Sequence, residues 1–130
     1  MGKGIVIDSN TVIDYLEGRL PQNGVQMVDQ LLNNGEAFLS DINKIELLSF
    51  NPPDPNALRV VEQFIQKCNV LPISKGIVNK TIELRKVHKR KLPDMIIAAT
   101  AFVHQFDIIS RNTKDFNNII GLTVIDPHTI

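Results

Sequence analysis

Short apolar runs that alternate with segments of helical periodicity constrain the fold of this chain most strongly. The first run, Ile5-Val6-Ile7, is continuous and β-branched, as in a strand of a parallel sheet that is covered on both faces. Further strands are expected at residues 37–39, 70–73, 107–110 and 122–125. Strands and helices that alternate over short connections predict an α/β fold with a largely parallel, five-stranded sheet.

The segments between these strands have the spacing of amphipathic helices. Ser9-Asn10-Thr11 offers caps for the first helix, and Ser40 offers a cap for the third. In that third helix, Ile42, Ile45, Leu47 and Leu48 are expected to form the buried stripe. A longer helix follows Ser74, and Pro93 suits the first turn of the last one.

Length and composition limit the class of protein. A chain of 130 residues that is 43% hydrophobic and 22% charged fits one domain spanning residues 1–130. Its apolar runs are broken well before the roughly 18 residues that a membrane span needs. The amino terminus runs directly into the first strand, so we expect no signal peptide, and Cys68 is the only cysteine. These features predict a cytoplasmic protein that does not bind a membrane.

Charge is distributed unevenly along the chain, although the formal net charge is zero. The first half is net acidic and the second half net basic, with a basic stretch from Arg85 to Lys91 that ends three residues before Asp94. Such asymmetry is a modest indication of a polyanionic ligand. The alternative is a solvated helix end, whose cations complement the helix dipole. The sequence alone leaves both interpretations open.

Four acidic residues stand beside apolar runs, and these are Asp8, Glu46, Asp94 and Asp115. Each has a local explanation, since an aspartate caps a helix, complements a helix amino terminus or forms a turn, and a boundary glutamate reaches water. In an open parallel sheet, however, ligands bind beyond the carboxyl ends of the strands. One fold of this kind would bring all four acids to that edge.

Clustered carboxylates favour a hard divalent cation. Mg²⁺ and Mn²⁺ take oxygen ligands and usually keep several waters, so a few carboxylates and a substrate phosphate suffice. Such an ion lowers the pKa of a bound water and neutralises charge on a phosphate, which suggests phosphoester hydrolysis. Zinc chemistry is poorly supported, because His88, His104 and His128 are scattered and have no partnered cysteine.

Taken together, four segments resemble a known family. Their sequences are IVIDSNTVIDYL from Ile5, IELL from Ile45, KLPDMIIAATA from Lys91 and SRNTKDF from Ser110. They look like the motifs of PIN-domain nucleases, and most like those of the VapC-type toxins of bacterial toxin–antitoxin pairs. The resemblance implies a three-layer α/β/α sandwich and a Mg²⁺- or Mn²⁺-dependent ribonuclease that cleaves single-stranded RNA. It also implies a homodimer and a small antitoxin partner.

The resemblance extends to individual site residues. Asp8, Glu46 and Asp94 match the first three acids of the family. Many members have a fourth acid where this chain has Asn112, three residues before Asp115. Either Asp115 takes the acidic role, or Asn112 contributes its amide oxygen. Ser9 matches a small hydroxyl residue that supports the site in the family.

From these matches we derive a working assignment of roles. Glu46 would orient or deprotonate the attacking water, or help to hold a second ion. The expected metal ligands are Asp8, Asp94 and Asp115, and the expected phosphate contacts are Lys89, Arg90 and Lys91.

Two other functions are compatible with the sequence. One is a non-catalytic RNA-binding or regulatory module of the same fold, which the neutral Asn112 keeps open. The other is a flavodoxin-like small-molecule binder. That fold would need a phosphate-cradling loop after the first strand, and Asp8-Ser9-Asn10-Thr11 lacks the glycines for it.

Overall fold

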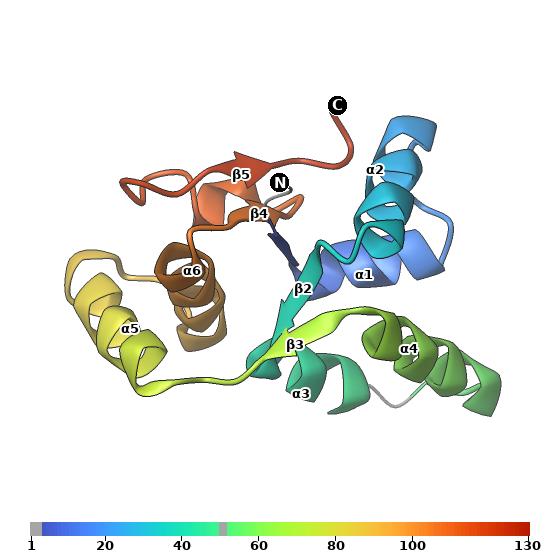
Figure 1. The fold of residues 1–130 in the computed structure, drawn as a ribbon, viewed down its shortest axis with the longest axis horizontal. Helices are drawn as coiled ribbons and strands as arrows, with labels where there is room; N and C mark the ends of the chain where they lie inside the picture. The colour runs from blue at the N-terminus through green and yellow to red at the C-terminus, as the bar shows by residue number, and fades with distance from the viewer. Residues whose placement is uncertain (1–3, 50–51) are drawn as a thin grey trace.

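A parallel five-stranded sheet forms the centre of the computed structural model, which describes residues 4–49 and 52–130. The strands are β1 (Ile5–Ile7), β2 (Ala37–Ser40), β3 (Asn69–Leu71), β4 (Asp107–Ile109) and β5 (Val124–Ile125). They pair in the order β3-β2-β1-β4-β5, and every pairing among them is parallel (Figure 1).

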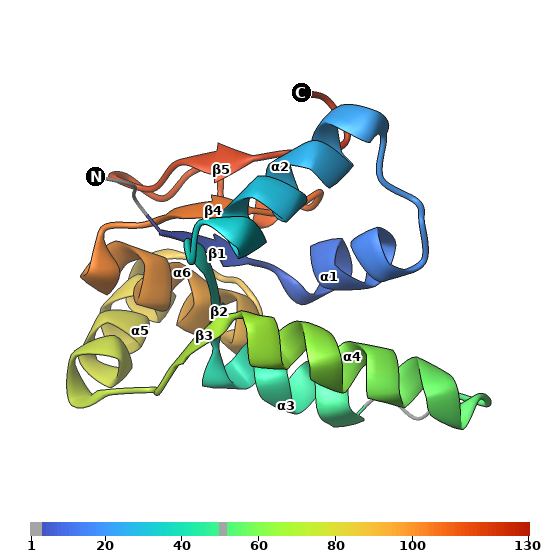
Figure 2. The same ribbon diagram turned by 45° about the vertical axis from the view of Figure 1, so that its right-hand side comes forward.

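Helices cover both faces of the sheet, as Figures 1 and 2 show. They are α1 (Ser9–Leu16), α2 (Gln22–Asn33), α3 (Asp41–Ser49), α4 (Pro55–Lys67), α5 (Lys75–Val87) and α6 (Leu92–His104), with a 3₁₀ turn η1 (Thr113–Asp115). α1, α2 and α4 pack on one face, and α5 and α6 on the other. This arrangement confirms the α/β/α sandwich. In the described part of the chain, no helix has both the length and the apolar character needed to cross a bilayer.

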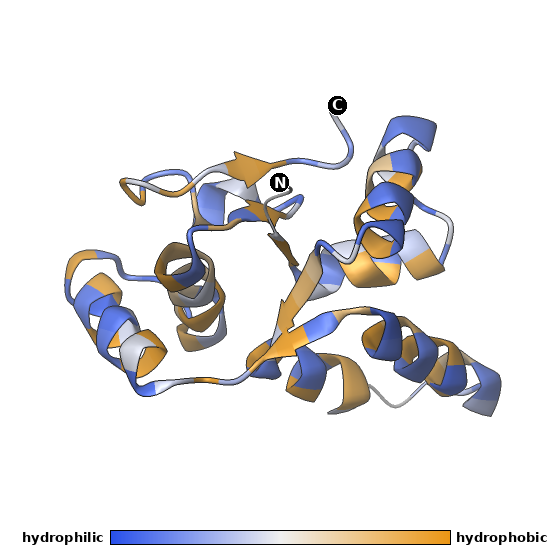
Figure 3. Ribbon diagram, in the orientation of Figure 1, coloured by the Kyte–Doolittle hydropathy of each residue, from blue (hydrophilic) through white to orange (hydrophobic). Residues whose placement is uncertain are grey.

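The side-chain alternation of β1 divides the core into two layers. Ile5 and Ile7 pack with the helices on one face, whereas Val6 packs with α5 and α6 on the other. All three side chains are buried, which is why the run is apolar at every position rather than at alternate ones. Figure 3 shows the apolar colouring concentrated on the strands and on the sides of the helices that face them.

The strand order places a topological switch point between β1 and β4. From β1 the chain builds outward through β2 and β3, and then returns to add β4 and β5 on the other side. Because β1 and β4 are in register, with Ile7 opposite Ile109, the residues that follow them lie side by side. Flavodoxin-like sheets have the order 2-1-3-4-5, so the flavodoxin-like interpretation is wrong.

The predicted stripe of α3 is wrong in part. Ile45 is 56% exposed and Leu48 is also exposed, whereas Leu47 and the polar Asn43 are buried. Asn43 and Leu47 are four residues apart and therefore share one helix face. That face is turned inward because the Asn43 amide oxygen accepts a hydrogen bond from the Ser40 amide at the end of β2 (2.9 Å).

A buried carboxylate fastens the carboxyl-terminal segment to the rest of the fold. Asp14 of α1 is 1% exposed and contacts Arg19, Arg111 and His128 at 3.0–3.1 Å. Burial alone would raise the pKa of Asp14, but the hydrogen bond with His128 and the two arginines hold it below its usual range. The cluster ties α1 to the segments that follow β4 and β5.

This cluster predicts that Asp14→Asn lowers the stability of the protein. The loss should be about 2 kcal/mol at pH 7, because a buried, hydrogen-bonded charge pair is broken but both arginines can turn to water. Since the folded-state pKa is depressed, the advantage of wild type is present above pH 4 and declines as the pH falls further. Urea denaturation at pH 7 and pH 3 measures this, with the exposed Glu62→Gln as control. Equal stability at pH 7 would contradict the role.

Candidate active site

Asp8 stands at the switch point between the carboxyl ends of β1 and β4. It is 5% exposed and serves as the N-cap of α1, which confirms the capping explanation of Asp8; Ser9, which was also expected to offer a cap, is the first residue of the helix. Its Oδ1 accepts the Ser9 amide proton (2.9 Å), and its Oδ2 accepts the Ser110 hydroxyl proton (2.7 Å). Asp8 therefore both caps α1 and lies at the candidate site.

Glu46 reaches the same place from α3. The residue is exposed, as expected for a glutamate at the boundary of the buried face, and it follows the exposed Ile45 and precedes the buried Leu47. Its Oε1 accepts a hydrogen bond from the Ser9 hydroxyl (2.8 Å), and the amide nitrogen of Asn43 donates to that hydroxyl oxygen (3.0 Å). Ser9 thus connects the helix that follows β1 with the helix that follows β2.

Asp94 lies in the first turn of α6, next to Pro93, which is also in that turn as predicted. Burial raises the pKa of the Asp94 carboxyl to about 6, and the negative charges of Asp115, Asp8 and Glu46 act in the same direction. The positive charge of Lys91 opposes them. A carboxyl that is affected by three others lies in a strongly negative local field.

The same electrostatic coupling acts on Asp8. Burial raises its pKa most, the hydrogen bonds from Ser110 and Ser9 oppose this, and the charges of Glu46 and Asp115 raise it further. The structure therefore places Glu46 and Asp115 close enough for their charges to act on both Asp8 and Asp94, although the four acids come from four separate segments of the chain.

The donor chemistry of this group fits Mg²⁺ or Mn²⁺. Carboxylate oxygens are the preferred ligands of both ions. Within the described residues, no three His, Cys, Asp or Glu side chains are arranged as a ready-made metal cage. Mg²⁺ is typically held by one or two carboxylates and several waters, so the donor set is compatible with an ion that one or two of these acids bind directly.

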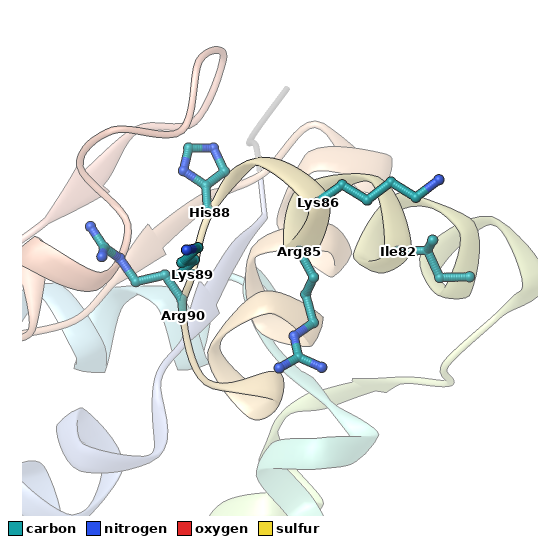
Figure 4. A pocket seen from close by; sticks show the side chains of 6 residues that line it. All are labelled: Ile82, Arg85, Lys86, His88, Lys89 and Arg90. Atoms are coloured by element: carbon teal, nitrogen blue, oxygen red, sulfur yellow. The ribbon is translucent and has the colours of Figure 1, made fainter.

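A basic basin lies at the carboxyl end of α5 (Figure 4). It has a volume of about 590 Å³ and is lined by Ile82, Arg85, Lys86, His88, Lys89 and Arg90. Arg90 also reaches across to η1, where its Nη2 donates to the Lys114 carbonyl (3.3 Å). Two of the three predicted phosphate contacts line the basin. Lys91 does not, and its charge acts on Asp94 instead.

Sequence reasoning missed two residues that hold the acids in place. Ser110 donates to Asp8, and its hydroxyl oxygen accepts the backbone N–H of Asn112 (3.0 Å). Its position directly after an apolar strand could have identified it. Asn43 gave no such signal, because a polar residue within a helix is usually exposed. Asn112 itself is exposed and contacts Ser110 through its backbone.

Comparison with known proteins identifies relatives that span nearly the whole chain. The PIN domain family model matches residues 5–122. Ribonuclease VapC1 of Rickettsia felis is 26% identical over 133 residues, which cover 94% of this chain and 95% of that protein. A toxin–antitoxin complex from Klebsiella pneumoniae contains a chain that is 31% identical, with a TM-score of 0.76, over 98% of this chain and 100% of that one. DNA-bound VapBC from Salmonella typhimurium shares the fold, with a TM-score of 0.81 and 23% identity over 96% and 98% of the two chains.

The raised pKa of Asp94 predicts that Asp94→Asn stabilises the metal-free protein. An acid whose pKa rises from 3.8 to about 6 on folding reduces stability as the pH rises through that interval. Because Asp94 is partly open to solvent, we expect a gain of about 1 kcal/mol at pH 8. The gain should vanish near pH 4.

Thermal unfolding in EDTA at pH 8 and pH 4 measures the effect. Asp107 is the first residue of β4, at the end of the strand away from the site, so Asp107→Asn is the control of the same residue type. A lower melting temperature for Asp94→Asn than for wild type at pH 8 would show that the carboxylate is not destabilised.

Proposed function

Because this chain belongs to the PIN-domain family, we propose that it is a metal-dependent endoribonuclease that cleaves single-stranded RNA. The observation that carries the proposal is the buried Asp8 at the switch point of the sheet, with Glu46 joined to the adjacent Ser9 and with the charges of Asp94 and Asp115 nearby. A relative of nearly the same length is named a ribonuclease.

In this proposal Asp8, Asp94 and Asp115 hold Mg²⁺ or Mn²⁺. When bound, the ion supplies a water of lowered pKa and neutralises charge that develops on the phosphate. The Ser110 hydroxyl fixes the carboxylate of Asp8 toward the site. Glu46 orients the attacking water and accepts its proton, because it is the acid of the four that stays exposed and reachable.

The basic residues hold the RNA. Lys89 and Arg90 line the basin and bind backbone phosphates without reading sequence, and Lys91 carries positive charge to the edge of the acidic group. The contact of Arg90 with the Lys114 carbonyl places the basin next to the turn that carries Asp115. An RNA strand that is bound in the basin would therefore lead toward the four acidic residues.

We also propose that the protein is the toxin of a toxin–antitoxin pair, that it forms a homodimer and that it acts in the cytoplasm. Support for an antitoxin comes from the Klebsiella relative, which was solved as a toxin–antitoxin complex. An apolar groove between α1 and α4, lined by Ile13, Leu16, Glu17, Ala57, Val60 and Val61, offers a surface for such a partner. Val60 is 43% exposed there.

The metal hypothesis predicts that Asp8→Asn and Asp94→Asn each abolish RNA cleavage. The rate should fall by roughly a thousandfold, since a bound metal contributes several kcal/mol to the transition state. A fluorescent single-stranded RNA and a Mg²⁺ titration measure cleavage, circular dichroism checks the fold, and Asp107→Asn serves as control. Full activity of Asp94→Asn would refute the assignment. RNA binding by wild type without metal-dependent fragments would favour a non-catalytic module.

The basic basin predicts salt-dependent binding of single-stranded RNA. Each lost phosphate contact should make the negative slope of log affinity against log salt shallower by about 0.7. We expect this change in Lys89→Ala and in Arg90→Ala. Fluorescence anisotropy in EDTA measures this without cleavage. Lys75→Ala, an exposed lysine at the other end of α5, is the matched control. Equal slopes for all four proteins would exclude the basin from the RNA path.

A further inference from the structure

We propose that Asn43 is a positioning residue that aims the Ser9 hydroxyl, and through it Glu46, in the proposed ribonuclease reaction. This inference rests on the proposed function for its catalytic consequence. Its structural basis is a chain of three hydrogen bonds that runs from the end of β2 through Asn43 and Ser9 to Glu46.

The orientation of the Asn43 amide is fixed by its surroundings. The residue is fully buried in the first turn of α3. Its oxygen accepts the backbone N–H of Ser40 (2.9 Å), and its nitrogen lies 3.0 Å from the Ser9 oxygen. The reversed amide would set one N–H against another at Ser40, so only one orientation satisfies the backbone.

This fixed amide determines where the Ser9 proton points. A serine hydroxyl has one proton to donate. Because the Asn43 nitrogen donates to the Ser9 oxygen, the hydroxyl proton is free for the Glu46 Oε1 at 2.8 Å. Without Asn43 the hydroxyl could rotate away from Glu46 and bond to water.

Glu46 requires such an anchor because it is an exposed, flexible side chain. A glutamate at the surface samples several rotamers, and holding one of them costs conformational entropy. The hydrogen bond from Ser9 engages Oε1, so in the proposal Oε2 accepts a hydrogen bond from the attacking water. A general base must be held within hydrogen-bond reach of the proton that it accepts. Asn43 would therefore raise the turnover rate without touching substrate.

The test is a double-mutant cycle of Ser9→Ala and Asn43→Ala, with Ser9→Thr as the variant that retains the hydroxyl. Single-turnover cleavage should slow about tenfold in each single variant. The double variant should also slow about tenfold, rather than a hundredfold, because both substitutions break the same series of hydrogen bonds. Ser9→Thr should restore the rate. KM and the Mn²⁺ affinity measured by electron paramagnetic resonance should stay unchanged, since neither side chain contacts RNA or metal in the proposal.

Asn69→Ala is the matched asparagine control. The Asn69 side-chain amide donates to the carbonyls of Gly35 and Ala37 at the amino-terminal ends of β2 and β3, away from Asp8, so its loss should leave the cleavage rate unchanged. A hundredfold loss in the double variant would show that Asn43 acts independently of Ser9 and would overturn the proposal. An undiminished rate in Asn43→Ala would overturn it as well.

A metal-free measurement separates this inference from the proposed function. In nuclear magnetic resonance of the protein in EDTA, the side-chain amide of wild-type Asn43 should be protected from hydrogen exchange and should lose protection in Ser9→Ala. An unchanged exchange rate would refute the hydrogen-bond chain, even for an active enzyme. Absence of metal-dependent cleavage in wild type would refute the proposed ribonuclease function but not the hydrogen-bond chain. Should Asn43→Ala fail to fold, the isosteric Asn43→Asp replaces it, because it keeps the oxygen for Ser40 and loses the donor to Ser9.

Discussion

The hydrogen bond between Asp8 and Ser110 is the interaction on which the arrangement of the site depends. It joins Asp8, which follows β1, to Ser110, which follows β4, at the point where the order of the sheet reverses. Burying a carboxylate there is costly, and the Ser110 hydroxyl and the Ser9 amide offset part of that cost. From these two serines the contacts spread outward, to Glu46 through Ser9 and to Asn112 through Ser110. The regular geometry of the sheet thus determines the position of the more flexible groups.

The two buried aspartates, Asp8 and Asp14, have opposite electrostatic surroundings. Asp14 has two arginines and a histidine around it, and its pKa is lowered. Asp8 is bound by neutral donors and lies near other acids, and its pKa is raised. Within the described residues, Asp14 has cationic partners, whereas the hydrogen bonds of Asp8 come from a backbone amide and a hydroxyl. This contrast supports the proposal that a bound cation would compensate the charge of Asp8. Groups that are left electrostatically unfavourable in a stable fold are expected at functional sites, where a ligand supplies the missing charge.

Much of this could be predicted from the sequence, because parallel strands buried on both faces leave unmistakable apolar runs. The end of such a run locates Asp8, and Pro93 locates the helix start beside Asp94. The rotation of α3 could not be predicted, since Ile42 and Ile45 mark one face and Asn43 and Leu47 another. Only the hydrogen bond between Asn43 and Ser40 decides between them. The contacts of Asp14 were equally hidden, because its partners lie up to 114 residues away.

The fourth acidic position can be argued from the turn that follows β4. The resemblance described above implies an acid at the position of Asn112. The Asn112 carbonyl accepts the Asp115 amide proton (3.1 Å), which closes the 3₁₀ turn η1. This turn brings Asp115 back toward the sheet, where its charge acts on both Asp8 and Asp94. Arg90 binds the carbonyl of Lys114 within the same turn. Negative charge is thus supplied three residues later in the chain, from a turn held against the basic basin. We therefore propose that Asp115, rather than the amide oxygen of Asn112, fills the fourth position of the site.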